Sequence, residues 1–213
     1  TRHYLNGIFL HLTESHGRNF LTGVATDSHR LSSSSLEIDK IDDFSSLILP
    51  RKTVFQLCSL LAETSDQLTM QTSENKIKFS LGTIDLISKV IDGKFPDYGR
   101  VIPDGHTNIF NINRESLLEA MLRASILSND KYRGIRMVVE ENNLKLISNN
   151  SEHEEAEEEI EIDYKGDKID IGFNVTYLID VLTNIQSEKL TIAFSDSSSS
   201  CLVTIPKNKE YKY

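Results

Sequence analysis

The chain of 213 residues has only two cysteines, Cys58 and Cys201, and neither belongs to a CxxC pair or a Cys/His cluster. This scarcity argues against a disulfide framework and a zinc site, and it fits a reducing, cytoplasmic setting. Both cysteines lie in apolar patterns, which predicts that they are small core residues. No apolar run is long enough to cross a membrane, so we expect no membrane partner.

Enzyme motifs are also scarce. The sequence has no GxSxG elbow, no P-loop and no GxGxxG, and HEEAE lacks the second histidine of HExxH. The run Asp27-Ser28-His29 contains the residue types of a hydrolase triad, but a triad needs side chains that converge from separate parts of a fold. We therefore predict no catalytic residues, no metal and no cofactor. A metal-dependent nuclease or hydrolase that uses Asp27 and His29 stays open as the alternative.

Charge is concentrated in one segment. The net charge is −9, and residues 152–163 (EHEEAEEEIEID) contain eight acidic residues and no Lys or Arg. Removing these eight residues leaves a net charge of −1. Such a strip is typical of a solvated strand or loop, or of a docking surface for a basic partner.

An internal duplication organises the chain. SDQLTM at 65–70 returns as SEKLTI at 187–192, and YLNGIFL at 4–10 resembles YRGIRMVV at 132–139. Each member of the first pair follows an apolar stretch of helical period and precedes two strands joined by a polar turn, with Ser197–Ser200 at the second turn. Asn174 is a good N-cap for the second helix. The helical positions are Val54, Leu57, Leu60 and Leu61, then Leu178, Val181, Leu182 and Ile185.

The repeated unit predicts an α+β fold of duplicated helix-strand-strand units, with helices on one side and sheets on the other. The segment 94–105 (KFPDYGRVIPDG) separates two domains, which we place at 1–99 and 100–213. A helical segment at 113–127 precedes the unit that begins at Tyr132, and none precedes the unit that begins at Tyr4. We therefore expect the first domain to lack its first helix. A repeat-built binding module without DNA also fits this pattern.

Several segments, in order, resemble the bacterial sliding clamp, the beta subunit of DNA polymerase III. They are YLNG, VATDSHRLS, LPRK, KVIDGKFPDYGRVIP, ILSNDKYRGIR, NNSEHEEAEE and FNVTYLIDVL, and they cover essentially the whole chain. The resemblance implies most of the middle domain and nearly all of the third domain of a ring-shaped homodimer. Helices would line the hole and sheets would form the outer wall.

In this family the clamp is a non-catalytic processivity factor in DNA replication. The resemblance implies topological, sequence-independent binding of duplex DNA. It also implies docking of the polymerase III catalytic subunit, the clamp loader and other clamp-motif proteins through short peptides. The residues that match the peptide pocket are Leu5, Thr26, His29, Arg30, Leu31, Pro96, Arg100, Val101, Asn174, Tyr177, Ser198 and Ser200.

Two further surfaces follow from the resemblance. DNA would be faced by Arg2, His3, Tyr4, Arg51, Lys52 and Arg123. The subunit contact would contain the apolar Ile126 and Leu127 and the acidic Glu152, Glu154, Glu155, Glu157 and Glu158, which would face a basic edge of the partner subunit. High salt should therefore weaken dimerisation.

The sequence departs from the family pattern at two places. Ser28 stands where the family usually has glycine between Asp and His, and serine adopts glycine-like backbone angles only at a cost. The sequence also stops at KNKEYKY, before the apolar tail that completes the pocket in the family. We expect a slightly altered turn at Ser28 and an incomplete pocket in this chain.

Overall fold

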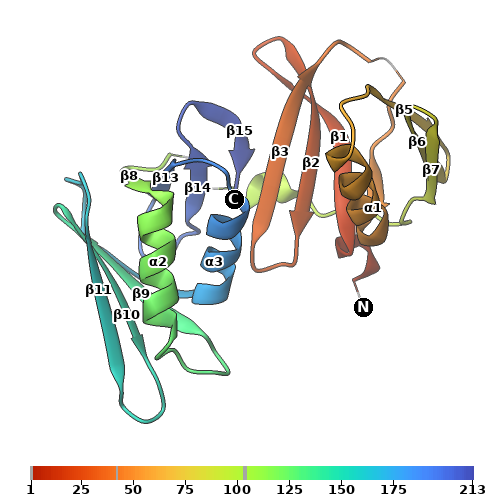
Figure 1. Cartoon of the computed structure of the whole chain (residues 1–213). Helices are drawn as coiled ribbons and strands as arrows, with labels where there is room; N and C mark the ends of the chain where they lie inside the picture. The colour runs from red at the N-terminus through yellow and green to blue at the C-terminus, as the bar shows by residue number, and fades with distance from the viewer. Residues whose placement is uncertain (1, 42, 103–104) are drawn as a thin grey trace. The chain divides into compact units, whose positions relative to one another are not determined.

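β-strands and three α-helices are the main elements among the residues that the computed structural model describes, which are 2–41, 43–102 and 105–213. The α+β fold predicted from the sequence is confirmed. The chain divides into two compact units, Thr1–Asp97 and Tyr98–Tyr213, and each is described by itself. Figure 1 shows the elements of both units.

Unit 1 contains one α-helix and two antiparallel groups of strands. Neighbouring strands run in the order β4-β1-β2-β3 in one group and β5-β6-β7 in the other. The turn between β1 and β2 has two residues with positive φ, His16 and Gly17, as a tight hairpin requires. The elements are η1 (His3–Leu5), β1 (Gly7–Ser15), β2 (Arg18–Thr26), β3 (Leu31–Ile38), β4 (Leu47–Pro50), α1 (Arg51–Ala62), β5 (Leu68–Ser73), β6 (Lys76–Leu81) and β7 (Ile84–Lys89).

One apolar cluster of unit 1 lies under α1. Alternate residues of β6 are buried, as period-two patterning predicts, and Ile77 and Phe79 meet Leu49 of β4 there. Helix α1 covers this cluster with Val54 and Leu57, which stay half-buried. Thr53 is the fully buried residue of α1, and its hydroxyl hydrogen-bonds that of Ser88 at 2.6 Å. Most of the α1 surface is therefore exposed.

Unit 2 contains two packed α-helices and two antiparallel groups of strands. Its strands run in the orders β11-β10-β9-β12 and β15-β14-β13-β8. The elements are η2 (Tyr98–Arg100), β8 (Asn108–Asn113), α2 (Arg114–Ser125), β9 (Gly134–Glu140), β10 (Asn143–Asn149), β11 (Glu155–Glu161), β12 (Ile169–Asn174), α3 (Val175–Asn184), β13 (Lys189–Phe194), β14 (Leu202–Ile205) and β15 (Asn208–Lys212).

Both helices of unit 2 begin at an asparagine cap. The Asn113 side chain accepts the Ser116 N–H, and the Asn174 side chain accepts the Thr176 N–H, so the predicted N-cap at Asn174 is confirmed. Helices α2 and α3 pack side by side (Figure 1) over one large apolar core. Leu117 of α2 and Leu182 of α3 are almost completely buried in this core.

The duplication is visible in the strand order. The group β4-β1-β2-β3 of unit 1 has the same order as β12-β9-β10-β11 of unit 2, and each is followed by a helix and a three-strand run. The repeated unit is longer than the sequence pattern predicted, because β7 and β15 add a strand after each predicted pair. Ser197–Ser200 lies in the connection between β13 and β14, as predicted.

One prediction about the core is wrong. Cys201 packs against the core of unit 2, but Cys58 of α1 is exposed. The helical pattern around Cys58 was identified correctly, but no second helix packs on that face within the described part of unit 1. No helix among the described residues is both long and apolar enough to span a bilayer.

Candidate functional site

A polar corner joins β2 to β3 in unit 1, between Thr26 and Leu31. Thr26 Oγ1 donates to the Arg30 carbonyl at 2.7 Å. Asp27 Oδ1 accepts the backbone N–H groups of His29 at 3.0 Å and of Arg30 at 3.1 Å, and Asp27 Oδ2 accepts Arg30 Nε at 3.0 Å. The carboxylate therefore organises the turn in which it lies, as aspartate commonly does.

These contacts give Asp27 a structural task. Burial acts to raise the pKa of Asp27, but the hydrogen bonds from His29 and Arg30 and the charge of Arg30 outweigh it and hold the pKa below its usual value. The Ser28 hydroxyl accepts Arg2 Nη1 at 2.8 Å. The Asp27 carboxylate is thus engaged by the backbone of His29 and by Arg30, and Ser28 by Arg2. The described residues contain no group of three His, Cys, Asp or Glu side chains that could hold a metal.

Ser28 has a left-handed backbone. Its φ is +79°, in the region that glycine adopts without cost and serine adopts at about 1 kcal/mol. Its N–H donates to Thr26 Oγ1 at 3.1 Å, and its hydroxyl accepts Arg2, so two hydrogen bonds accompany the strained conformation. Ser28 therefore takes the backbone conformation that suits the glycine usual at this position in the family.

Three segments of unit 1 carry the residues predicted for the peptide pocket. The corner holds Leu31, η1 holds Leu5, and the loop after β7 holds Pro96. The Arg2–Ser28 hydrogen bond joins the start of η1 to the corner. Gly93 brings the loop against η1, because a Cβ built on Gly93 would lie 3.2 Å from Tyr4 Cβ.

The loop is anchored by an aromatic contact next to Pro96. The Phe95 ring is 6% exposed and stacks on Phe9 of β1, with centroids 4.9 Å apart and planes 6° apart. Leu5 and Leu31 are half-buried, whereas His29 and Pro96 are exposed. Unit 1 thus has two partly accessible apolar side chains, Leu5 and Leu31, and an exposed polar one, His29, among its predicted pocket residues.

The remaining predicted pocket residues belong to unit 2. Arg100 ends η2, and Val101 follows it with 59% of its surface exposed. The Tyr177 carbonyl accepts the Tyr213 hydroxyl at 2.9 Å, and the side-chain oxygen of Asn174 caps α3. These two hydrogen bonds hold the start of α3, to which the predicted pocket residues Asn174 and Tyr177 belong.

The serine-rich turn of unit 2 is organised by Asp196. Asp196 Oδ1 accepts the Ser198 N–H and hydroxyl, both at 2.7 Å, and the Ser199 hydroxyl at 2.8 Å. These hydrogen bonds, first of all those from Ser198, lower the pKa of Asp196 to about 2. Ser200 is exposed. Asp196 therefore positions Ser198 within the turn, as Asp27 positions Arg30 in unit 1.

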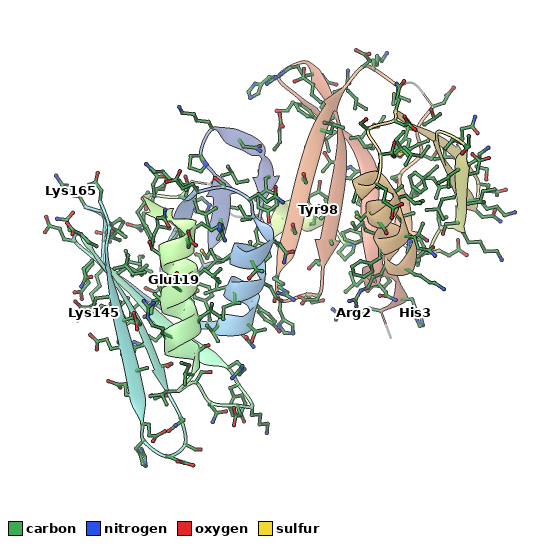
Figure 2. The ribbon with its side chains drawn as sticks, viewed as in Figure 1. Arg2, His3, Tyr98, Glu119, Lys145 and Lys165 are labelled. Carbon is green, nitrogen blue, oxygen red and sulfur yellow. The ribbon has the colours of Figure 1, made fainter. Side chains whose placement is uncertain are left out.

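The start of α1 is basic and lacks a side-chain cap. Arg51 and Lys52 are exposed, the preceding Pro50 provides no cap, and the first turn has no acidic residue. The Arg51 N–H donates to the Asn6 carbonyl at 3.1 Å, which ties the helix to the segment after η1. Figure 2 labels Arg2 and His3 at the end of unit 1, and both are exposed. Helix N-termini and cations both favour anions.

Arg123 of α2, which the resemblance assigned to DNA, pairs with a residue that the resemblance assigned to the subunit contact. Arg123 Nε donates to Glu158 Oε1 at 2.9 Å, and Arg123 Nη2 donates to Glu158 Oε2 at 2.8 Å. Glu119 lies 3.9 Å from the same guanidinium. The hydrogen bond to Glu158 raises the pKa of Arg123, and the hydrogen bond from Arg123 lowers the pKa of Glu158. No sequence pattern indicated this pair, because the two residues are 35 positions apart.

The acidic strip forms the turn before β11 and β11 itself, which is the end strand in the order β11-β10-β9-β12. Lys145 of β10 contacts Glu157 at 3.0 Å and Glu159 at 2.5 Å, and the hydrogen bond with Glu159 leads the causes that raise the pKa of Lys145. Glu152 and Glu154 are exposed in the turn. The strip is therefore partly neutralised within unit 2, and Figure 2 labels Lys145 on this sheet.

The predicted subunit-contact residues lie on two neighbouring elements of unit 2. Ile126, directly after α2, is 76% exposed, and Leu127 is half-buried. Glu155, Glu157 and Glu158 are on β11, which packs against α2. The fold thus brings the apolar and acidic members of this group to adjacent elements.

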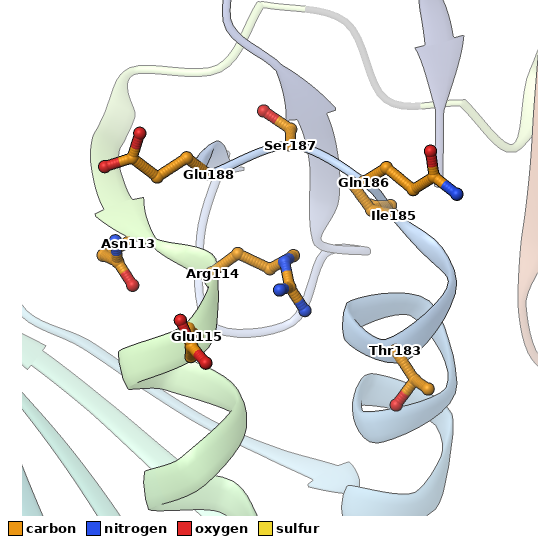
Figure 3. A pocket seen from close by; sticks show the side chains of 8 residues that line it. All are labelled: Asn113, Arg114, Glu115, Thr183, Ile185, Gln186, Ser187 and Glu188. Atoms are coloured by element: carbon orange, nitrogen blue, oxygen red, sulfur yellow. The ribbon is translucent and has the colours of Figure 1, made fainter.

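A cavity of about 500 Å³ lies where α2 begins and α3 ends (Figure 3). Arg114 extends between the two helices, and its Nη1 donates to the Leu182 carbonyl at 2.9 Å. The Arg114 N–H donates to the Glu188 carbonyl at 2.9 Å. Arg114 therefore caps the end of α3 and has a structural role at this cavity. The sequence analysis did not single out Arg114.

Comparisons with known proteins agree with the duplication. The family model of the DNA polymerase III beta subunit central domain matches residues 1–97, and that of its C-terminal domain matches residues 99–213. The "Beta sliding clamp" of Pseudomonas putida is 42% identical over 100% of this chain and 57% of the relative. That of Escherichia coli K12 is 42% identical over 93% of this chain and 53% of the relative.

Solved structures give the same result. The DNA polymerase III subunit beta from Pseudomonas aeruginosa is 41% identical and has a TM-score of 0.92, over 100% of this chain and 58% of that chain. The Caulobacter crescentus beta sliding clamp is 36% identical and has a TM-score of 0.95, over 100% and 57%. This chain therefore spans little more than half the length of the proteins it matches.

Proposed function

The chain belongs to the DNA polymerase III beta subunit family, the bacterial sliding clamps, and from this we propose that it forms most of a non-catalytic processivity clamp in DNA replication. The observation that carries the proposal is the consecutive match of the central and C-terminal domain families along the whole chain. The clamp would form a homodimeric ring around duplex DNA and would tether the polymerase and other replication and repair proteins. Its action would need no catalytic residue, metal or cofactor.

Closed-ring binding suits the charge of the chain. Stable attachment to DNA by charge alone needs several phosphate contacts, and a protein of net charge −9 provides few. A ring holds DNA by topology, so weak contacts are enough. Arg51 and Lys52, at the basic start of α1, are the residues we assign to phosphate contact, together with Arg2 and with His3 and Tyr4 of η1. Full-length protein should stay on circular DNA and leave it after linearisation.

Partner peptides of the Gln-Leu-x-Leu-Phe kind are the proposed ligands of the predicted pocket residues in unit 1 and in unit 2. Leu31 and Leu5 would contact the apolar peptide side chains, and Arg30 and His29 would supply polar contacts beside them. The corner suits this task because its backbone is held by Asp27 while Leu31 stays half-buried and accessible. In unit 2, exposed Val101 and Ser200 would contribute from their own segments.

The test is fluorescence polarisation of a labelled Gln-Leu-Ser-Leu-Phe peptide against this chain and the full-length protein. Leu31→Asp should weaken binding more than about tenfold, because it places a charge against an apolar anchor. Leu36→Asp is the matched control, since Leu36 lies on the same strand and is 65% exposed. Equal effects of the two substitutions, or no binding by the full-length wild type, would refute the docking role but leave the family assignment intact.

The hydrolase alternative is tested separately. We expect no cleavage of single-stranded or duplex DNA above background with Mg²⁺ or Mn²⁺, because the Asp27 carboxylate is already engaged by His29 and Arg30. Cleavage that Asp27→Asn abolishes would contradict the non-catalytic proposal.

A further inference from the structure

The Arg123–Glu158 pair connects a helix to the acidic end strand of unit 2. Arg123 is in the last turn of α2, and Glu158 is in the middle of β11. Two parallel hydrogen bonds of 2.9 and 2.8 Å fix the orientation of both side chains, which a single-point contact would not do. The side chain of Glu158 is 25% exposed, so it lies partly under the guanidinium. A guanidinium held in this way is poorly placed to reach a DNA phosphate.

The pair lies beside the apolar end of α2. Ile126 follows Arg123 by three residues, which is less than one helical turn, and it is 76% exposed. The same end of α2 is joined to β10, since the Ser148 hydroxyl donates to the Ala124 carbonyl. Two separate links thus join the end of α2 to the sheet, one to β10 and one to β11.

The second link also places a cation among crowded carboxylates. Glu155, Glu157, Glu158 and Glu159 follow one another closely on β11, and like charges on one strand repel. Lys145 contacts Glu157 and Glu159 on one side of the strand. Glu158 has its side chain on the opposite side, where Arg123 is its cation. Each side of β11 therefore has its own cation.

We propose that Arg123 is a positioning residue of the subunit-contact surface, which holds Glu158 and β11 in place beside Ile126 and Leu127, and that it is not a DNA contact. The proposal rests on the proposed function, because it assumes that a second copy of the full-length clamp docks on this surface. The partner would offer an apolar patch next to basic side chains, to match Ile126 and the acidic residues of the strip. Fixing the strand in advance lowers the ordering cost of that association.

The experiment measures dimer dissociation of the full-length protein by sedimentation velocity, together with its retention on circular DNA. Arg123→Gln should raise the dimer dissociation constant roughly three- to tenfold. In a Glu158→Gln background, Arg123→Gln should add little, because its effect passes through Glu158. Arg136→Gln is the matched control: Arg136 makes an equivalent two-bond pair with Asp170 between β9 and β12, and its loss should leave dimerisation unchanged.

The possible outcomes separate this inference from the proposed function. An effect of Arg123→Gln on dimerisation, with an unchanged unfolding midpoint and unchanged DNA retention at saturating protein, would support it. Additive effects of Arg123→Gln and Glu158→Gln would overturn it, as would weaker DNA retention with normal dimerisation. If the wild-type protein is monomeric at every concentration, both the ring proposal and this inference fail. If the wild type dimerises and Arg123→Gln has the same dimer dissociation constant, this inference alone fails.

Discussion

Helices α1 and α3 occupy equivalent places in the two units, yet they are buried very differently. Helix α3 fully buries Val175, Leu178, Val181 and Leu182, whereas α1 fully buries Thr53. Aligning the helix starts places Cys58 opposite Leu182, and Phe55 of α1 is 61% exposed. The difference follows from α2, which packs along α3. Similar apolar patterns therefore give different burial when the neighbouring element differs.

The two corners show the opposite case, in which different residues build related side-chain turns. Asp27 closes the corner between β2 and β3, and Asn150 closes the one between β10 and β11 by accepting the N–H groups of Glu152 at 2.9 Å and Glu154 at 3.0 Å. Both are side-chain turns of the Asx kind. Asp27 also carries a charge that fixes Arg30, which Asn150 cannot supply. The unit 1 corner therefore presents a positioned cation.

The largest expected effect tests the contrast between the helices. Leu182→Ala should destabilise unit 2 by about 2–5 kcal/mol, because it leaves a cavity in a packed core. Cys58→Ala, at the equivalent place on α1, should change the stability of unit 1 by less than about 0.5 kcal/mol. Hydrogen–deuterium exchange, read separately for the two units, measures both. A large effect of Cys58→Ala would show that α1 is covered in solution.

A smaller effect is expected at the unit 1 corner. Ser28→Gly should stabilise the protein by about 0.5–1 kcal/mol, because glycine adopts a φ of +79° without strain. Ser28→Ala is the control, since it removes the hydroxyl that accepts Arg2 but keeps the strain. Urea denaturation compares the three proteins. Equal shifts for the two variants would mean that the Arg2 hydrogen bond, and not the backbone, governs the corner.

The smallest effect concerns pH. His11 of β1 stacks on Phe9, and burial lowers the pKa of His11 below its ordinary value of 6.5, partly opposed by a hydrogen bond with the Leu12 backbone. The unfolded chain therefore binds the proton more readily, so unit 1 should lose stability as the pH falls below 6.5. Aligning Gly7 with Gly134 places Val138 opposite His11 in unit 2.

His11→Val makes unit 1 resemble unit 2 at this position and should remove its part of the pH dependence. Urea denaturation of wild type and variant at pH 7.5 and pH 5 measures the difference. Equal pH dependence of the two proteins would mean that burial of His11 does not contribute.

Local features of the sequence were predictable. Helical periodicity located the three α-helices of the described residues, and the Asn174 cap was identified from residue type. The repeated segments revealed a duplication that the strand order confirms. The polar corner after FLTGVAT and the cost of serine at position 28 were also foreseen. Apart from the duplication, which compares segments far apart, each of these features depends on residues that are close together in the chain, so one short segment contains the information.

What only the tertiary structure decided depends on residues far apart in the chain. The exposure of Cys58 follows from what packs on α1. The pairing of Arg123 with Glu158 follows from the register of β11 on β10 and from the packing of α2 against β11. The contacts from Arg2 to Ser28 and from Arg114 to Leu182 likewise join separate elements. The sequence by itself determined the helices, the repetition and the family. Packing and strand register decided which charges meet, because a one-residue shift of a strand would turn every side chain to the other face.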